Sequence, residues 1–418
     1  MQYIVGTLLP GAAVTSSLDE YLQFAGTKIN YSSKRFSDSE FHLKPHGLLS
    51  EAGIRQQKLR CTEWEGLKIF FNTIGDFPFD VFAAAFYLLT RYEEYLPHRK
   101  DSYGRYAHTE SLAFREGFLH LPLVDLWAES FYRAIKQVFV SFTPPAHSFR
   151  FIPTYDIDIA YSVKGSGPLR QLYAMVRNRS FGVKGKDVFD IYGWLDQLHE
   201  DADALPIYFF LLAARRSKYD KNRHPRSASL RRLIQEVATK YRIGLHPSWQ
   251  SHDDAELVQS ELLTLEEISG RKTVAARQHY IRLTLPATYR NYIGAGIAED
   301  YSMGYGSING FRASSCRPFF WYDLIAEQTT SLQIHPFCFM DANASFEEGL
   351  DAPAALKCLL QYRDIVRSVN GELITIFHNH FLTEQPQWQR WREMYKQFIA
   401  GNFVPNAALT FPSQPAPL

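Results

Sequence analysis

The chain has 418 residues, of which 46% are hydrophobic and 15% aromatic, so it is long enough for two or three domains with large cores. Its 45 basic and 44 acidic residues leave a formal net charge of +1, which gives no support to a nucleic-acid partner or an anionic membrane surface. The four cysteines show no C-x-x-C spacing, which argues against a structural zinc cluster or a disulfide framework. No apolar run approaches membrane-spanning length and the opening residues lack a basic signal-peptide segment, so we expect a cytoplasmic protein without a membrane span.

Residues 1–145 form a first region, which begins with an apolar segment at 3–9 where we expect a strand. An amphipathic helix should start at Asp80, a candidate N-cap, and end before Pro97. A second helix is predicted at 124–138, and a Pro-Pro linker closes the region. These elements indicate a small α/β or α+β domain, whose role the sequence does not reveal.

Over residues 148–400 short apolar runs alternate with amphipathic stretches. Strands are predicted at 149–155, 206–213, 242–245, 273–276, 333–336 and 372–377, and helices at 227–240, 255–268, 353–369 and 388–400. This alternation predicts an α/β domain with a largely parallel sheet, and a size of roughly 250 residues suits a (β/α) barrel. The tail, 401–418, is expected to be ordered only by docking.

The most informative feature is the pair Asp156 and Asp158, which ends the apolar run Phe-Ile-Pro-Thr-Tyr-Asp-Ile-Asp. In an extended strand the i, i+2 spacing places both carboxylates on one face. Unpaired buried charge is energetically expensive, so two such carboxylates indicate a metal site or acid–base chemistry. A capping or salt-bridged pair is the alternative.

Three histidines also follow predicted strands: His246, His279 and His378. Any one of them is more often an ordinary hydrogen-bonding residue than a ligand. A barrel, however, would gather the ends of all these strands at one mouth. One aspartate and two histidines form a common ligand set for a catalytic divalent metal, which leaves positions open for water and substrate.

With these residues in view, the chain over about 148–385 resembles the polysaccharide deacetylase family, carbohydrate esterase family four. Thr154-Tyr-Asp156-Ile-Asp158 resembles the family's Thr-Phe-Asp-Asp-Gly motif, and Ile376-Phe-His378 resembles its final Leu-x-His. The resemblance implies a distorted (β/α) barrel of about seven strands and a divalent metal, with zinc the expected ion. It also implies Asp156 as the base, Asp158 as a metal ligand and His378 as the acid.

Two departures from the family pattern concern the metal. The paired aspartates are separated by Ile157, and the second motif, His-Thr-x-x-His, is matched only by its first histidine, His246, because Gln250 stands at the distal position. We infer that His279 replaces the missing ligand, so that the metal set is Asp158, His246 and His279. His252 is a weaker candidate for the same place.

The remaining candidate site residues follow from the resemblance or from residue type. Arg312 loosely matches the family's Arg-x-Pro motif and would orient Asp156, although an ordinary buried salt bridge is an equal expectation. Three aromatic residues could stack on sugar, though packing is the more frequent role of each: Trp249, Tyr155 and Tyr305. Asp220 and Asp300 are loop carboxylates that we expect at the surface.

The sequence thus predicts a metal-dependent hydrolase that removes N- or O-linked acetyl groups from a carbohydrate. A barrel that binds glycans without catalysis is the main alternative, because the second-motif histidine is missing. A D-x-D glycosyltransferase is a second alternative, although that fold needs a nucleotide-binding βαβ region before the D-x-D. Hydrolysis of a non-sugar amide is a third.

Overall fold

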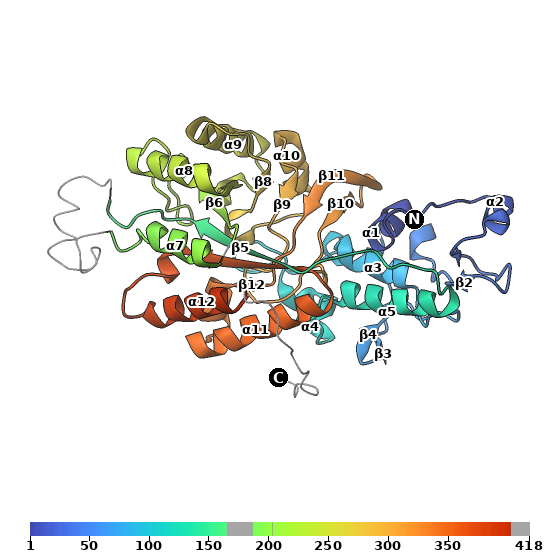
Figure 1. Cartoon of the computed structure of the whole chain (residues 1–418). Helices are drawn as coiled ribbons and strands as arrows, with labels where there is room; N and C mark the ends of the chain where they lie inside the picture. Colours follow the sequence, from blue (N-terminus) through green and yellow to red (C-terminus); the bar gives the residue numbers. More distant parts are fainter. Residues whose placement is uncertain (165–186, 203, 403–418) are drawn as a thin grey trace.

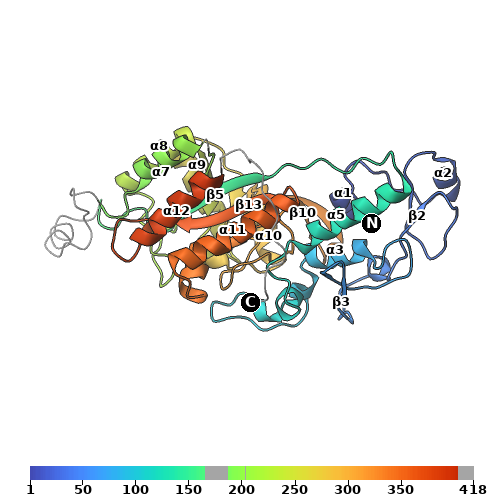
Figure 2. The ribbon, with the colours of Figure 1, turned by 60° about the horizontal axis from the view of Figure 1, so that its bottom comes forward.

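The computed structural model describes residues 1–164, 187–202 and 204–402, so the predicted tail lies outside the description from residue 403 onward. Two parts lie side by side in Figure 1, an N-terminal region of helices and short strands and a large sheet surrounded by helices. An extended segment runs from the end of α5 (Leu123–Val138) back to β5 (Arg150–Ile157), the first strand of the large sheet (Figure 2). No helix in the described part of the chain is long and apolar enough to cross a membrane.

The large sheet has nine strands in the order β10-β11-β9-β8-β7-β6-β5-β13-β12. All neighbouring strands are parallel except β10 and β11, which are antiparallel. The strands after β5 are β6 (Ile207–Leu211), β7 (Arg242–His246), β8 (Ala275–Ala276), β9 (Glu299–Asp300), β10 (Phe319–Asp323), β11 (Gln328–Ile334), β12 (Phe339–Met340) and β13 (Glu372–His378). The expected parallel α/β sheet is confirmed. Three of the strands were not predicted. Strands β9 and β12 are too short to produce a periodic pattern, and the third is the aromatic strand β10.

Helices lie along the outside of this sheet, as Figures 1 and 2 show. They are α7 (Tyr192–Ala202), α8 (Ala228–Lys240), α9 (Ala255–Ser269), α10 (Ala287–Ala295), α11 (Ala352–Ser368) and α12 (Gln389–Asn402). The four predicted helices are confirmed, while α7 and α10 were not predicted. Side-chain caps set their starts: the Asp254 carboxylate accepts the Leu257 N–H of α9, and Asp351 does the same for Ala354 of α11.

The sheet curls so that side chains of distant strands meet on its inner side. Ile152 of β5, Phe209 of β6 and Ile376 of β13 belong to one small buried cluster there. Arg277, just after β8, donates to the Thr154 hydroxyl of β5 at 2.7 Å, although two strands lie between β8 and β5. No strand pairing joins β10 to β12 in the described residues, so the sheet does not close into the expected barrel there.

The N-terminal region contains α1 (Gln2–Leu8), α2 (Leu18–Gln23), α3 (Val81–Leu89), α4 (Leu112–Arg115) and α5, with the short strands β1 (Ile29–Asn30), β2 (Phe41–His42), β3 (Thr62–Trp64) and β4 (Leu67–Ile69). The strand predicted at 3–9 is wrong. That segment is α1, in which Ile4 and Leu8, one turn apart, are both buried. Asp80 caps α3 as predicted, because its carboxylate accepts the Ala83 N–H at 3.0 Å.

Helix α3 ends earlier than predicted because Arg91 adopts a left-handed conformation with φ of 54°. The turn places a buried charge network between the two parts of the molecule. Glu94 accepts two hydrogen bonds from Arg312, at 2.6 and 2.8 Å, and one from Arg91 at 2.8 Å. Arg91 also donates to the main-chain carbonyl of Arg312. These fully buried pairs join the N-terminal region to the loop after β9.

We expect Glu94→Gln to lower the free energy of unfolding at pH 7 by about 3 kcal/mol, because it leaves buried guanidinium charge uncompensated. Burial alone would raise the pKa of Glu94, but Arg312 and Arg91 lower it to about 2. The contribution is therefore complete above the unfolded-state pKa of about 4.3 and is lost as the pH falls toward 2. Urea unfolding between pH 7 and pH 3 should show the difference between wild type and variant shrinking.

The control is Glu236→Gln, which removes an exposed ion pair with Arg232 and should change stability by less than about 0.5 kcal/mol. An effect of Glu94→Gln no larger than that of the control would contradict the stabilising role of the buried network.

Candidate metal centre

Strand β5 delivers Asp156 and Asp158 to one end of the curled sheet. The alternation of the strand puts Thr154 and Asp156 on the inner face, where both contact Arg277. The intervening Tyr155 lies on the opposite face, where its fully buried hydroxyl is 2.7 Å from His199 Nε2 and 2.6 Å from the Tyr395 hydroxyl. Tyr155 is thus a packing residue against the outer helices, the more frequent of the two roles expected for it, and it is too deeply buried to stack on sugar.

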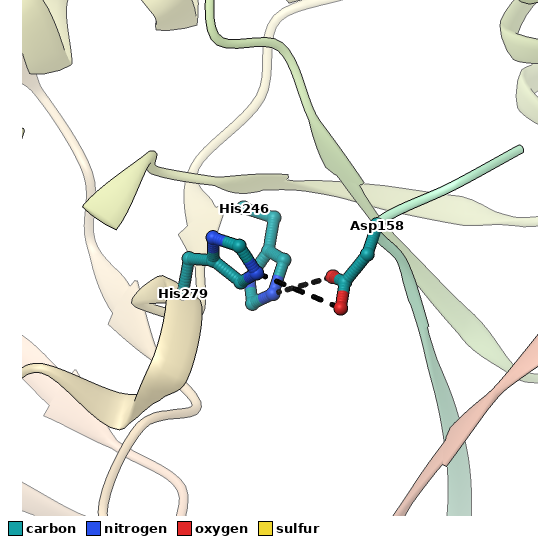
Figure 3. A group of neighbouring side chains, drawn as sticks. All are labelled: Asp158, His246 and His279. Carbon is teal, nitrogen blue, oxygen red and sulfur yellow. Dashed lines mark ion pairs between the residues drawn. The ribbon is translucent and has the colours of Figure 1, made fainter. Parts of the chain in front are cut away.

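Asp158 lies against two imidazoles from neighbouring strands, as Figure 3 shows. Its Oδ1 is 3.2 Å from His246 Nε2, and its Oδ2 is 3.5 Å from His279 Nε2. His246 is the last residue of β7, and His279 follows β8 in a short turn, so adjacent parallel strands bring the two rings together. One potential ligand atom from each of the three residues lies within 4.8 Å of the others.

These three side chains fit a divalent metal. Asp158 Oδ1 is buried, and its contact with His246 Nε2 at 3.2 Å does not have the geometry of a hydrogen bond, so no hydrogen bond to the described residues uses this oxygen. One carboxylate oxygen and two imidazole nitrogens are suitable ligands for zinc and related ions, and three protein ligands leave a position open. Sequence reasoning selected all three residues, and the structure places them in one group.

The outer nitrogen of each imidazole in this group is held by a second partner. His246 Nδ1 is hydrogen-bonded to the main-chain carbonyl of Arg277. His279 Nδ1 lies 2.9 Å from Oδ1 of Asp220. Such contacts fix the ring orientation and leave Nε2 facing the centre, as in the carboxylate–histidine–metal arrangement. Asp220 is fully buried, so the prediction that it lies at the surface is wrong. The same prediction is wrong for Asp300, which is buried and accepts a hydrogen bond from the Tyr289 hydroxyl.

Carboxylates and imidazoles at the centre shift one another's pKa values. Burial alone would raise the pKa of Asp158, but the His279, His246 and His378 imidazoles hold it well below its usual range. Burial alone would lower the pKa of His279, yet Asp158 and Asp220 raise it to about 9. The carboxylates thus favour positive charge at the position between them, which a divalent cation would supply.

Asp156 is oriented by an arginine that the sequence did not single out. Arg277 Nη1 donates to Asp156 Oδ1 at 2.8 Å, and Arg277 Nε donates to the Tyr301 carbonyl at 2.9 Å. For Arg312 we expected either this role or an ordinary buried salt bridge, and its pairing with Glu94 of the N-terminal region confirms the salt bridge. Arg277 follows strand β8 just ahead of His279 in Arg-Gln-His, which was a usable signal in the sequence.

His378 ends β13 in register with Asp156 on β5, so the two lie side by side. Its Nε2 is 3.6 Å from Asp158 Oδ2, and its Nδ1 is 2.6 Å from Asp341 Oδ1. Burial alone would lower the pKa of His378, but Asp341, Asp158 and Asp156 raise it to about 10. Asp341 was not predicted as a site residue from the sequence, although it ends the apolar run Cys-Phe-Met-Asp in the same way that Asp156 ends its own run.

The other predicted residues lie around or away from the centre. Gln250 donates to Asp220 Oδ2 at 2.9 Å and so supports the partner of His279. His252 pairs with Asp253. Tyr305 is buried at the junction, where its hydroxyl accepts from Arg91 at 3.2 Å, so it cannot stack on a ligand there. Trp249 is half-buried, and Arg282 and Tyr219 lie over its ring.

Comparison with known proteins gives limited information. Residues 1–140 match DUF7033, a family of unknown function, and no curated protein matches the chain. Solved structures that are similar include a Mycobacterium smegmatis protein assigned as a polysaccharide deacetylase, at 14% identity and a TM-score of 0.38, covering 65% of this chain and 97% of that one.

Two further structures are similar over 62% of this chain. One is a polysaccharide deacetylase from Bacillus cereus, at 10% identity and a TM-score of 0.30, matched over 89% of its length. The other is a GH57 branching enzyme from Thermococcus kodakaraensis, at 8% identity and a TM-score of 0.34, matched over 68% of its length. Because these scores lie below 0.5, functional inference has to rest on the residues of the centre.

We expect purified protein to bind about one zinc ion per chain, and Asp158→Ala, His246→Ala and His279→Ala each to abolish that binding. Asp220→Asn should weaken binding 10- to 100-fold, because it removes the partner that orients His279. Titration calorimetry with zinc, together with elemental analysis, measures both effects.

The matched control is Asp341→Asn, which removes an equally buried carboxylate from a histidine outside this group of three and should leave zinc binding unchanged. Undiminished zinc in all three alanine variants would show that the ion binds elsewhere.

Proposed function

We propose that this protein is a metal-dependent hydrolase that removes acetyl groups, N- or O-linked, from a carbohydrate. The observation that carries the proposal is the joint placement of a three-residue metal set and two further oriented groups. Asp156 and His378 both lie beside Asp158, and each is held by a buried partner outside the metal set, Arg277 for one and Asp341 for the other. Such a pair suits a general base and a general acid.

A divalent cation held by Asp158, His246 and His279 would polarise an acyl carbonyl and lower the pKa of a water molecule. Asp156 would accept the proton of the attacking water. The hydrogen bond from Arg277 occupies Oδ1 of Asp156 and leaves Oδ2 facing His246 Nε2 at 3.6 Å, on the side of the centre.

His378 would protonate the departing amine or alkoxide. Asp341 accepts both the main-chain N–H and the Nδ1 hydrogen of His378, at 2.6 Å each, so the ring is fixed with Nε2 toward the centre. The same carboxylate stabilises the imidazolium form, and a protonated ring is the state that a general acid needs. Asp341 is therefore a positioning residue for His378.

The acetyl and carbohydrate parts of the proposal rest on the motif resemblance of Thr154-Tyr-Asp156-Ile-Asp158 and Ile376-Phe-His378. Zinc is the proposed ion because one carboxylate and two imidazoles are typical zinc ligands. The glycosyltransferase alternative is not favoured. In residues 1–149, all of which are described, no strand joins the large sheet, so β5 has no nucleotide-binding βαβ unit before its D-x-D.

We expect zinc-loaded wild type to release acetate from N-acetylchitopentaose or from acetylated xylan, and Asp156→Asn to reduce kcat about 10²- to 10⁴-fold while retaining zinc. The substitution keeps the shape of the side chain and removes its ability to take a proton. Acetate release by a coupled assay measures kcat, and elemental analysis measures the zinc.

Asp253→Asn serves as the control, because this exposed carboxylate lies outside the centre and its loss should leave kcat unchanged. Zinc-loaded wild type that binds oligosaccharide without releasing acetate would favour the non-catalytic glycan-binding alternative instead.

His378→Gln should affect substrates according to their leaving group. For sugar acetyl groups kcat should fall about 10²- to 10⁴-fold, because an amine or alkoxide must be protonated to depart. For p-nitrophenyl acetate the loss should be less than about 10-fold, since p-nitrophenolate leaves without a proton. Equal losses for both substrates would contradict a general-acid role of His378.

A further inference from the structure

An aromatic cluster lies directly beside the metal centre and is built from distant parts of the chain. Tyr280 follows His279, Tyr219 precedes Asp220, and Trp249 lies in the turn after β7. The fourth member, Tyr103, comes from a loop of the N-terminal region, residues 100–106. All four side chains are half-buried, so each has part of its surface in contact with solvent.

The rings contact one another in sequence. Tyr103 and Tyr280 have ring centroids 5.3 Å apart, Tyr280 and Tyr219 5.3 Å, and Tyr219 stacks on Trp249 at 4.4 Å. Tyr280 also connects the cluster to the centre, because the rings of Tyr280 and His279 are 4.7 Å apart. The cluster therefore extends from a metal ligand to the N-terminal region.

The polar atoms at the tips of these side chains have no hydrogen-bond partner in the part of the chain that the structure describes. None of the three tyrosine hydroxyls makes a hydrogen bond within the described residues, and Trp249 Nε1 is buried without an acceptor there. Tyrosine side chains that present both an apolar face and a free hydroxyl are suited to ligands with apolar faces and many hydroxyl groups. Carbohydrate rings have that chemistry.

The loop that carries Tyr103 is rigidly built. Asp101 Oδ1 accepts the main-chain N–H groups of Tyr103 and Arg105, at 2.9 and 3.0 Å. Asp101 Oδ2 accepts Arg105 Nε at 2.6 Å, and the Arg105 guanidinium lies 4.7 Å from the Tyr103 ring centroid. Lys100 and Tyr106 close the loop as an antiparallel bridge. Tyr103 is thus held in one orientation toward the cluster.

The same loop also supports the turn that carries His279. Tyr280 has φ of 59° and Ile281 φ of 52°, a strained conformation for residues other than glycine that persists only where the surroundings enforce it. Arg105 Nη1 donates to the Tyr280 carbonyl at 2.9 Å, and a Cβ at Gly306 would lie 2.0 Å from the same nitrogen. The close approach of Arg105 therefore depends on glycine at position 306.

We propose that the N-terminal region completes a sugar-binding surface in which Tyr103, Tyr219 and Tyr280 contact the rings of an oligosaccharide next to the ring that carries the acetyl group, while Trp249 packs against Tyr219. This inference rests on the proposed function, because the metal centre defines which ring is acted upon. The surface would select substrates of several sugar rings over single sugars. It also gives the N-terminal region a direct role in substrate binding.

The test compares wild type with Tyr103→Ala, each zinc-loaded and full-length. Calorimetry would measure Kd for N-acetylchitopentaose and for acetylated xylopentaose, and kcat and KM would be measured with p-nitrophenyl acetate as a small substrate. For whichever of the two pentasaccharides wild type binds, we expect Tyr103→Ala to raise Kd about 3- to 10-fold. Zinc content should stay near one ion per chain, and the kinetics with p-nitrophenyl acetate should change by a smaller factor than the pentasaccharide Kd, because that substrate has no further sugar rings for Tyr103 to contact.

Tyr103→Phe is the matched variant, since it keeps the ring and should retain most of the affinity, while Tyr21→Ala removes a tyrosine from the N-terminal region far from the cluster and should have no effect. An unchanged Kd for Tyr103→Ala, or no binding of either pentasaccharide by wild type, would overturn the inference. Binding that depends on Tyr103 without acetate release would instead contradict the proposed hydrolase and leave the surface standing. If wild type releases acetate from a pentasaccharide and Tyr103→Ala leaves the pentasaccharide Kd unchanged, the sugar-binding surface is contradicted and the proposed hydrolase stands.

Discussion

The grouping of histidines at the end of the sheet depends on the carboxylate of Asp158. It is placed where desolvation opposes its charge, and by geometry its Oδ1 has no hydrogen bond among the described residues. A partly buried carboxylate with one oxygen shielded from water needs nearby positive charge. The Nε2 atoms of His246, His279 and His378 all lie within 3.6 Å of it. The strands β5, β7, β8 and β13 each supply one of these groups, so the curl of the sheet is what makes the centre.

The Nδ1 atoms of the three imidazoles, which face away from Asp158, also have fixed partners. A main-chain carbonyl, Asp220 and Asp341 each fix one ring through Nδ1. Gln250 holds Asp220 in turn, because its side-chain amide donates to Asp220 Oδ2 at 2.9 Å. Gln250 thus supports the orientation of His279 from one step further out.

The N-terminal region is part of this arrangement. Glu94 binds Arg312 at the base of the junction, and Arg105 binds the turn that carries His279 and Tyr280. Both contacts use arginine, whose planar group donates in several directions at once and remains charged when buried. The region that matches a family of unknown function is therefore in direct contact with the turn that carries His279, and a separately tethered domain would lack such a contact.

Much of the centre could be predicted because strand periodicity and the common end of parallel strands are local rules. They placed Asp156, Asp158, His246, His279 and His378 together. The same periodicity puts Tyr155 on the opposite face, so its assignment to a sugar site ignored that rule. The partners of Arg312 and Tyr305 lie more than 200 residues away along the chain, and no pattern within one sequence reveals such pairs. The contribution of Tyr103 was hidden for the same reason.

The most direct test of the account is a crystal structure of the zinc-loaded protein with data collected at the zinc absorption edge. The account predicts one anomalous peak bounded by Asp158, His246 and His279, with metal–nitrogen and metal–oxygen distances of about 2.0–2.2 Å. An anomalous peak elsewhere on the chain, or none in protein that retains hydrolase activity, would contradict it.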